Sequence, residues 1–476
     1  MEVYYFKLVC RAIVLISILS GKLSILNEKI GETKMEVKIS KLTLAALSAL
    51  LFTPVAQSIE LTTAIKLEPI IYKPLGDFVL VAPKLDPVYV QKWGRNTYNC
   101  GTQTRPCLTI NQGIYRAIST GAPYSASSIS KIYVGPGKYT ENVRANKTGI
   151  RISSTHGTDS TIIEASNPQH DTVHISADGV YFGKYKKGFT LTGSTDSNGL
   201  FSTGSYGQVY GNRAVKNGVR GFQFGNSSMA VGPMDPSEPI TGGNPSQPLV
   251  NVTNVSVYYN IAESNGEGGF YFSDFDNSTV RYNEARNNLQ TVGGFIGFGS
   301  GYWIDMQSNN DRIEYNIATG NERSGFFYRR FGVTDQITRY NQSSENQSHG
   351  YMLMGDALTI TYNTATNNAD DGFHYMGYDQ VLEFAYNTSV GNTGTGVTFG
   401  GEFAAGMTSV DDMHHNNFIN NNAAGNCGLT NNFQNNGITP YSNFWGNMYV
   451  AGPGANPADD LCGMNTVVAT PTTMMN

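Results

Sequence analysis

Two adjacent carboxylates and a histidine stand out in the second half of the sequence. Asp370 and Asp371 lie in "NADDGFHYM", and His374 follows Asp371 by three residues. Histidine suits proton transfer near neutral pH, and a neighbouring carboxylate can orient its ring. The stretch is therefore a candidate acid–base site. The other interpretation is a set of solvated turn residues, because Asp before Gly is ordinary turn chemistry.

Three further charged residues complete the candidate site. His349 lies in "QSHGYM", and Arg329 and Arg330 follow "FFY". Abstraction of a proton next to a carboxylate needs a base and a positive charge that stabilises the enolate. We predict His349, His374 or a tyrosine as the base, and Arg329 and Arg330 as the positive charge. No lysine occurs after Lys216, which excludes a lysine base in this part of the chain.

The segments that must position these residues form an internal repeat. Residues 258–273, 314–329, 339–354 and 361–376 each read aromatic–Asn, a small residue, a second Asn, a loop and Gly–aromatic. The first Asn of each copy recurs at spacings of 23, 33, 25, 22, 24 and 29 residues, at Asn260, Asn283, Asn316, Asn341, Asn363, Asn387 and Asn416. Such a period indicates a solenoid. Alternation within each copy predicts short strands, so the fold is an all-β parallel β-helix with stacked Asn side chains.

Alignment on the repeated glycine predicts which side chains face the solvent. The first and third residues after it are aromatic or aliphatic and are expected to stack in the core. The residue before it is expected to face outward, which places His349 and Asp371 on adjacent coils. The outward positions also hold Tyr271, Trp303 and Phe327, followed by Asp305. We predict that these four residues bind sugar, unless residues 59–94 or 226–250 cover them.

Three further stretches carry a resemblance to a known family. Residues 107–119 look like a capping helix, residues 131–145 like a first strand–turn–strand, and "NFWGN" with "GPG" like the end of a solenoid. With the repeats, they resemble the right-handed parallel β-helix superfamily of pectate-lyase-like proteins over residues 95–462. The resemblance implies a right-handed solenoid with an N-terminal capping helix and a polysaccharide partner. Many lyases of this fold also use calcium.

The N-terminal region reads as an export signal. Residues 35–58 combine two lysines, a short apolar run and small residues at a cleavage site, so translation is predicted to start at Met35. Residues 1–34 are either a mis-assigned start or a second hydrophobic segment. We divide the chain into a leader (1–58), an extended segment (59–94), the β-helix (95–462) and a tail (463–476). After signal cleavage no run is long enough to span a bilayer.

Cysteine content and net charge agree with an exported protein. Cys10 lies in the leader, and the other four cysteines form two predicted disulfides, Cys100–Cys107 and Cys427–Cys462. Zinc is the alternative, but no CxxC or histidine cluster accompanies them. A net charge of −5 gives no sign of a nucleic-acid partner. We expect a secreted, periplasmic or cell-surface location.

These features predict an exported lyase or C5-epimerase acting on an acidic polysaccharide. The alternative is a non-catalytic, adhesin-like β-helix that binds glycans. A glycoside hydrolase is a third reading, because "DDG" and "SHG" resemble polygalacturonase motifs. Their order along the chain departs from that family, which argues against hydrolysis.

Overall fold

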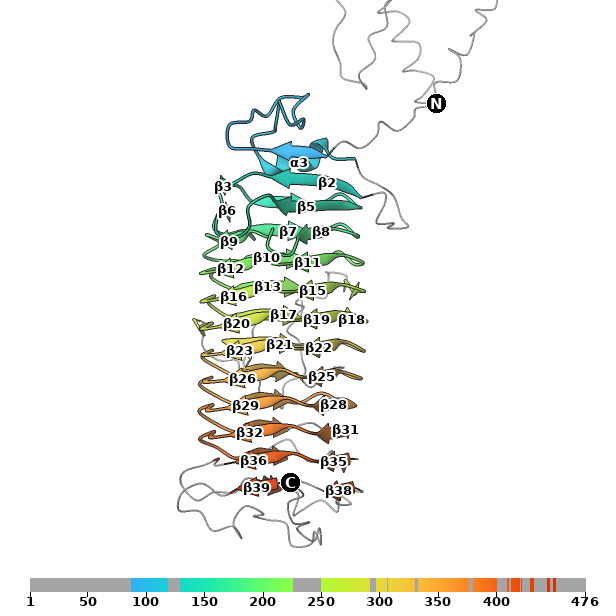
Figure 1. The fold of residues 1–476 in the computed structure, drawn as a ribbon, viewed down its shortest axis with the longest axis vertical. Helices are drawn as coiled ribbons and strands as arrows, with labels where there is room; N and C mark the ends of the chain where they lie inside the picture. Colours follow the sequence, from blue (N-terminus) through green and yellow to red (C-terminus); the bar gives the residue numbers. More distant parts are fainter. Residues whose placement is uncertain are drawn as a thin grey trace, which may run out of the picture. The chain divides into compact units, whose positions relative to one another are not determined.

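The fold is a stack of short coils whose strands form three parallel sheets (Figure 1). The computed structural model describes residues 87–118, 129–225, 250–291, 297–305, 307–329, 333–375, 380–399, 409–410, 412–419, 421, 429–431, 443–445 and 448–450. Within these residues each coil contributes one strand to each sheet, and each strand pairs in parallel with the strands of the coils before and after it. The parallel β-helix predicted from the repeats is confirmed.

One sheet has 14 strands, which are β1 (Val88–Val90), β2 (Ser130–Val134), β5 (Ile150–Ser154), β8 (Tyr181–Gly183), β11 (Gln208–Tyr210), β15 (Ser256–Tyr258), β19 (Thr279–Arg281), β22 (Arg312–Glu314), β25 (Ile337–Arg339), β28 (Leu358–Thr361), β31 (Gln380–Ala385), β34 (Ser409–Val410), β35 (Asp412–His414) and β38 (Asn443–Trp445). The 12-stranded sheet comprises β3 (Gly137–Thr140), β6 (Thr161–Glu164), β9 (Thr190–Thr192), β12 (Arg213–Val215), β16 (Ile261–Glu263), β20 (Glu284–Arg286), β23 (Ile317–Thr319), β26 (Gln342–Ser344), β29 (Thr364–Thr366), β32 (Thr388–Val390), β36 (Asn417–Ile419) and β39 (Met448–Val450).

The 11-stranded sheet carries the candidate site and comprises β4 (Val143–Ala145), β7 (Val173–Ile175), β10 (Leu200–Ser202), β13 (Arg220–Phe224), β17 (Gly268–Phe272), β21 (Ser300–Ile304), β24 (Phe326–Tyr328), β27 (Tyr351–Leu353), β30 (Phe373–Tyr375), β33 (Val397–Phe399) and β37 (Leu429–Asn431). A small two-stranded sheet pairs β14 (Val252–Thr253) with β18 (Phe275–Asp276).

A short helix, α3 (Ile110–Arg116), packs against β1, β2 and β4. The Thr109 hydroxyl accepts a hydrogen bond from Gln112 N, and the carboxylate of Glu141 accepts from Ile110 N and Asn111 N, so the first turn is fully capped. The capping helix expected within residues 107–119 is confirmed, as is the Cys100–Cys107 disulfide. Cys427 and Cys462 lie outside the described residues, as do the predicted signal peptide and most of the segment 59–94.

Asparagine side chains form two ladders along the stack rather than the single one predicted. In each ladder the backbone N–H and Nδ2 of one Asn donate to Oδ1 of the next, with Nδ2–Oδ1 distances of 2.8–3.2 Å. The first ladder comprises Asn212, Asn260, Asn283, Asn316, Asn341, Asn363, Asn387 and Asn416. The second comprises Asn217, Asn265, Asn288, Asn321, Asn346, Asn368, Asn392 and Asn421. All are buried, so the ladders satisfy backbone groups at the coil corners.

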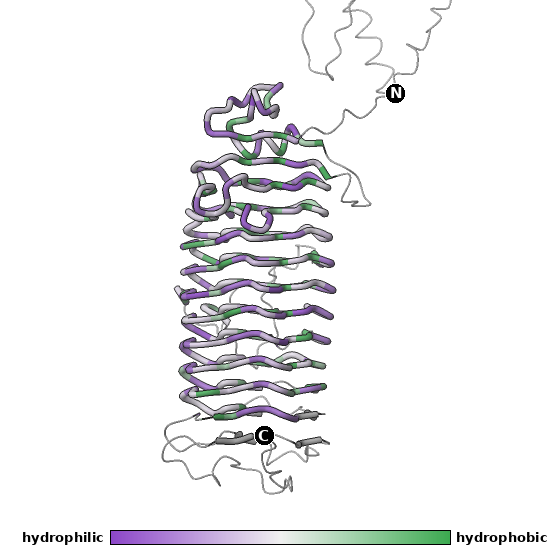
Figure 2. The backbone as a smooth tube through the Cα atoms, viewed as in Figure 1, coloured by the Kyte–Doolittle hydropathy of each residue, from purple (hydrophilic) through white to green (hydrophobic). Residues whose placement is uncertain are grey.

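Aromatic rings stack inside the solenoid, as expected from the glycine alignment. Ring centroids of neighbours are 4.6–5.0 Å apart, and the planes are almost parallel, in the series Phe222, Phe270, Tyr302, Phe326, Tyr351 and Phe373. Figure 2 shows hydrophilic and hydrophobic residues alternating along the coils. The stacked aromatic side chains therefore fill the interior, and the side chains that face outward are the candidates for binding or catalysis.

The glycine that precedes each core aromatic creates the geometry of the outer face. A Cβ on Gly350 would lie 2.5 Å from Gly372 O and 2.8 Å from the Ala365 Cβ, so this position points into the crowded interior. The following residue, Tyr351, also faces inward. Because two consecutive residues face the core, the residue before the glycine and the second residue after it both face outward. This local conformation brings together two outward side chains that are three residues apart in the sequence.

Candidate functional site

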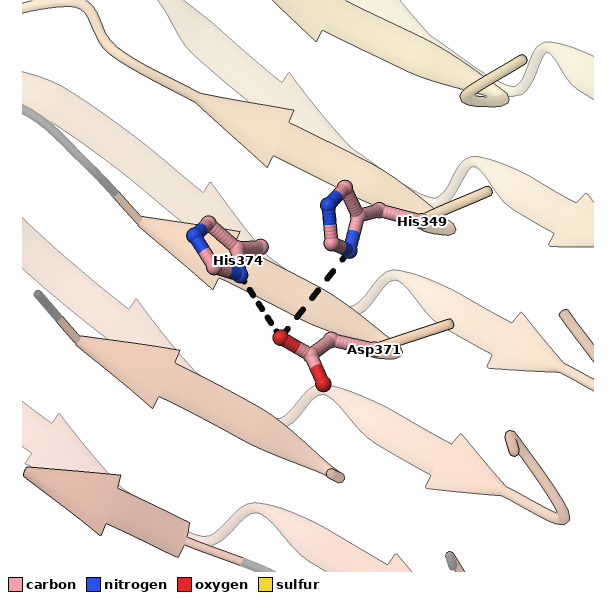
Figure 3. A group of neighbouring side chains, drawn as sticks. All are labelled: His349, Asp371 and His374. Atoms are coloured by element: carbon pink, nitrogen blue, oxygen red, sulfur yellow. Dashed lines mark hydrogen bonds and ion pairs between the residues drawn. The ribbon is translucent and has the colours of Figure 1, made fainter. Parts of the chain in front are cut away.

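Asp371 and His374 occupy the two outward positions that flank Gly372 and Phe373. His374 Nδ1 lies 2.6 Å from Asp371 Oδ2, and the two side chains are 17% and 10% exposed. Figure 3 shows His349, from the coil before, directed at the same carboxylate oxygen. The local conformation at Gly372 and the stacking of coils thus assemble a histidine–aspartate–histidine group on the outer face of the 11-stranded sheet.

The next coil holds the carboxylate of Asp371 in place. Its Oδ1 accepts hydrogen bonds from Thr395 N at 2.7 Å and from Thr395 Oγ1 at 2.8 Å. Burial alone would raise the pKa of Asp371, but the hydrogen bond from His374, the positive charge of the histidines and the Thr395 N–H outweigh it and hold this pKa at about 2. Asp371 is therefore a fixed anion that orients His374. The repeat pattern places Thr395 one coil after Asp371, but Thr395 was not among the predicted site residues.

His349 lies directly beside His374. The two ring centroids are 4.4 Å apart, and His349 Nδ1 lies 3.9 Å from Asp371 Oδ2. His349 Nε2 is 3.6 Å from Asp370 Oδ2, whose side chain is 52% exposed. The Nδ1 atom of His349 is buried without a hydrogen-bond partner. Burial and the charge of His374 lower the pKa of His349 against the opposing effect of the two aspartates, so its ring is neutral at neutral pH.

The arrangement resembles the orienting half of a general-base pair. An Nδ1–H donated to Asp371 leaves Nε2 of His374 as the basic atom, which is the logic by which a buried carboxylate directs a catalytic imidazole. In its column His374 lies between Met352 of the coil before and Thr398 of the coil after. The structure therefore brings together four predicted site residues: His349, Asp370, Asp371 and His374.

Arg329 is buried in an ion pair with another predicted site residue. Its Nη1 lies 3.3 Å from both carboxylate oxygens of Asp305, and both side chains are almost fully buried. The Tyr271 hydroxyl donates to Asp305 at 2.7 Å. Arg329 follows β24, whereas His349 precedes β27, so the two residues lie at opposite ends of neighbouring strands. Asp305 thus neutralises the guanidinium that was expected to flank the histidines. Arg330 lies outside the described residues.

The aromatic strip occupies one column, as predicted, but it is not exposed. Tyr271, Trp303 and Phe327 pair in register and are 1%, 4% and 0% exposed. They form an apolar cluster with Phe298, Met352 and Met354. Phe298 belongs to the connection between β20 and β21, and its ring lies 5.5 Å from that of Trp303. The expectation of an exposed strip is wrong, because this connection supplies a cover that the repeat pattern does not contain.

The three residues of Figure 3 are also the group that could hold a metal ion in the described part of the chain. One ligand atom from each of His349, Asp371 and His374 lies within 4.8 Å of the others. Two imidazoles and one carboxylate suit zinc or a similar ion better than calcium, which prefers oxygen ligands. The 2.6 Å contact of His374 with Asp371 is a hydrogen bond, since two ligands of one zinc ion at ~2.1 Å would be about 3.4 Å apart.

Three solved structures are similar to the chain in fold. One is the Azotobacter vinelandii mannuronan C-5 epimerase AlgE4 A-module, which is 14% identical in sequence. The match covers 70% of this chain and 82% of the AlgE4 chain, with a TM-score of 0.42. The Agl-KA catalytic domain is 13% identical, with coverages of 74% and 67% and a TM-score of 0.49. A mutant of the periplasmic alginate epimerase AlgG is 13% identical, with coverages of 68% and 76% and a TM-score of 0.40.

Comparison by sequence identifies no related protein. No protein-family model matches the chain, and no curated protein does. Among the described residues, no helix is long and apolar enough to cross a membrane.

Proposed function

We propose that the protein is an exported lyase or C5-epimerase that acts on an acidic, uronate-containing polysaccharide. The observation that carries the proposal is the imidazole of His374, held by the anionic Asp371 at 2.6 Å beside the neutral ring of His349 on the outer face of the 11-stranded sheet. His374 Nε2 takes the proton from the carbon next to the substrate carboxylate. The resulting enolate then either expels the neighbouring glycosidic oxygen or is reprotonated on the other ring face.

The same chemistry requires positive charge beside the substrate carboxylate. Arg329 is not available in its present pairing, because the Asp305 carboxylate neutralises it. We assign this positive charge to Arg330, as predicted from the sequence. Tyr271, Trp303, Phe327 and Asp305 lie within or beside the buried cluster, so the proposed site does not include them.

Export rests on the predicted signal peptide and on the Cys100–Cys107 disulfide. Disulfides persist in oxidising compartments and are rare in the cytosol of most organisms. The predicted location is therefore the periplasm, the cell surface or the medium.

A non-catalytic glycan-binding protein is the second candidate. It is favoured by the recurrence of paired polar side chains at the same two outward positions in other coils, for example Arg220 Nη1 donating to Gln223 Oε1 at 2.8 Å. Such pairs can stabilise a solenoid face without doing chemistry. In that case Asp371 and His374 would contribute to binding alone.

The deciding experiment incubates the purified protein with alginate, pectate and glycosaminoglycans. Elimination creates an unsaturated uronate that absorbs in the ultraviolet, and epimerisation changes the uronate composition seen by NMR. We expect one of these signals with one polyuronate, and its loss in His374→Ala. His156→Ala is the matched control, because His156 is exposed and lies outside the 11-stranded sheet. Binding without either signal would favour the second candidate and overturn the enzymatic one.

A further inference from the structure

The outer face of the 11-stranded sheet holds a second aspartate–histidine pair in the same two positions. Asp171 and His174 flank Thr172 and Val173, and Val173 is in register with Leu200, which is in register with the core aromatic Phe222. Asp171 therefore corresponds to Asp371, and His174 to His374. The two pairs are separated by seven steps along the strand order from β7 to β30, or about 34 Å at ~4.8 Å per strand.

The carboxylate of Asp171 is fixed in the same way as that of Asp371. Its Oδ1 accepts from Ser197 Oγ at 2.6 Å, from Asn198 Nδ2 at 3.0 Å and from Asn198 N at 3.2 Å. Its Oδ2 lies 3.7 Å from His174 Nδ1, and the Asp171 and His174 side chains are 12% and 27% exposed. The next coil thus supplies the bonds that hold the anion, as Thr395 does for Asp371.

A guanidinium and an aromatic ring flank this second histidine. Arg144 is the register neighbour of His174 on one side, and Phe201 is its neighbour on the other. The Phe201 ring lies 5.0 Å from the imidazole. All three side chains are partly exposed, unlike the buried aromatics of the coils between the two sites. Within the described residues the guanidinium of Arg144 makes no hydrogen bond or ion pair, so its charge is free to bind a ligand.

The side chains of Arg144, His174 and Phe201 suit the binding of a sugar that carries a carboxylate. Arginine offers a planar pair of donors that matches a carboxylate, and an exposed aromatic ring can lie against a sugar ring. Burial, with a contribution from Arg144, lowers the pKa of His174 against the effect of Asp171, so the imidazole is neutral at neutral pH and can donate or accept a hydrogen bond. Glu141 holds the position of Asp171 in the preceding coil. Its carboxylate already accepts hydrogen bonds from two backbone N–H groups of α3.

We propose that Arg144, His174 and Phe201 form a second binding site for an acidic sugar unit of the same polysaccharide. The identity of the ligand rests on the proposed function, whereas the site itself rests on the free guanidinium and its neighbours. Both sites lie on the same face of one sheet, so a long chain can engage both while a short one engages only one. The expected consequence is that affinity rises with chain length, because the second contact becomes intramolecular.

The test measures the Kd of the full-length protein for polymannuronate, polyguluronate and polygalacturonate by calorimetry. Arg144→Ala should raise the Kd for the long polyuronate about tenfold or more, as expected for loss of a charge-assisted pair. Arg151→Ala is the matched control, since Arg151 lies on the 14-stranded sheet over the Tyr181 ring, and it should leave the Kd unchanged. Arg144→Lys should restore part of the affinity.

The possible results separate this inference from the proposed function. An unchanged Kd in Arg144→Ala, in a protein that converts the polyuronate, would overturn the second site alone. A Kd that depends on Arg144 in a protein without turnover would support the second site and overturn the lyase and epimerase. A wild-type protein that binds no polyuronate would overturn both.

Discussion

At the level of single residues, the proposed reaction depends on the fixed anion of Asp371. In Asp371→Asn the amide oxygen can still accept from Thr395, but His374 loses the carboxylate that orients its ring. We expect kcat/KM on the polyuronate to fall by about 10²–10⁴-fold, with the fold unchanged by circular dichroism. Asp370→Asn, at the more exposed neighbour, is the control and should cost less. Equal activity of Asp371→Asn and wild type would remove Asp371 from the site.

The depressed pKa of Asp371 also predicts how stability depends on pH. Because the folded pKa of about 2 lies below the ordinary value of 3.8, ionised Asp371 stabilises the fold above pH ~4, and this contribution is lost as pH falls towards 2. The loss should be on the order of 2 kcal/mol. Denaturant unfolding of wild type and Asp371→Asn at pH 6, 4 and 2 measures it. The difference between the two proteins should shrink on acidification, and a constant difference would contradict the assignment.

At the scale of elements, the asparagine ladders hold each coil on the next. Asn316 Oδ1 accepts from the backbone N–H and Nδ2 of Asn283, while its own Nδ2 donates to Val280 O and Asn341 Oδ1. Asn316→Ala removes these bonds and leaves a buried N–H unpaired, so we expect a loss of about 3 kcal/mol. Urea unfolding checks this value.

The control for the ladder is Gln342→Ala, at an exposed position of β26 in the neighbouring coil. Its side chain takes no part in the ladders, so its unfolding midpoint should stay close to that of wild type. If both variants unfold at the wild-type midpoint, the ladder is not a main source of stability.

The repeats predict most of this architecture because each coil obeys a local rule. The Asn spacing predicts the ladder, and the glycine alignment predicts both the core stack and the meeting of His349 with Asp371. The repeat pattern predicts less well which side chain pairs with which when several partners lie within reach. Asp305 and Arg329 follow neighbouring strands in one column, so their pairing could be seen in the sequence, yet Arg329 was assigned to the histidines. The cover over Trp303 could not be foreseen, because Phe298 lies in a connection that departs from the repeat.

At the scale of the whole molecule, each coil contacts mainly its neighbours, so perturbations should stay local. The Cys100–Cys107 disulfide and α3 lie at one end of the described solenoid, next to β1. Replacing both cysteines by serine should destabilise this end by about 2–3 kcal/mol. Hydrogen exchange should therefore accelerate in α3 and β1 and stay unchanged in β24 and β27. Faster exchange throughout the solenoid would contradict this local picture.

The proposed reaction requires His374 to remove the proton next to the substrate carboxylate. The most direct measurement follows the release of deuterium into water from a polyuronate labelled at C5, because both elimination and epimerisation break that bond. We predict release by the wild-type protein and by His156→Ala, and none above background by His374→Ala. Release by His374→Ala at the wild-type rate would contradict the claim.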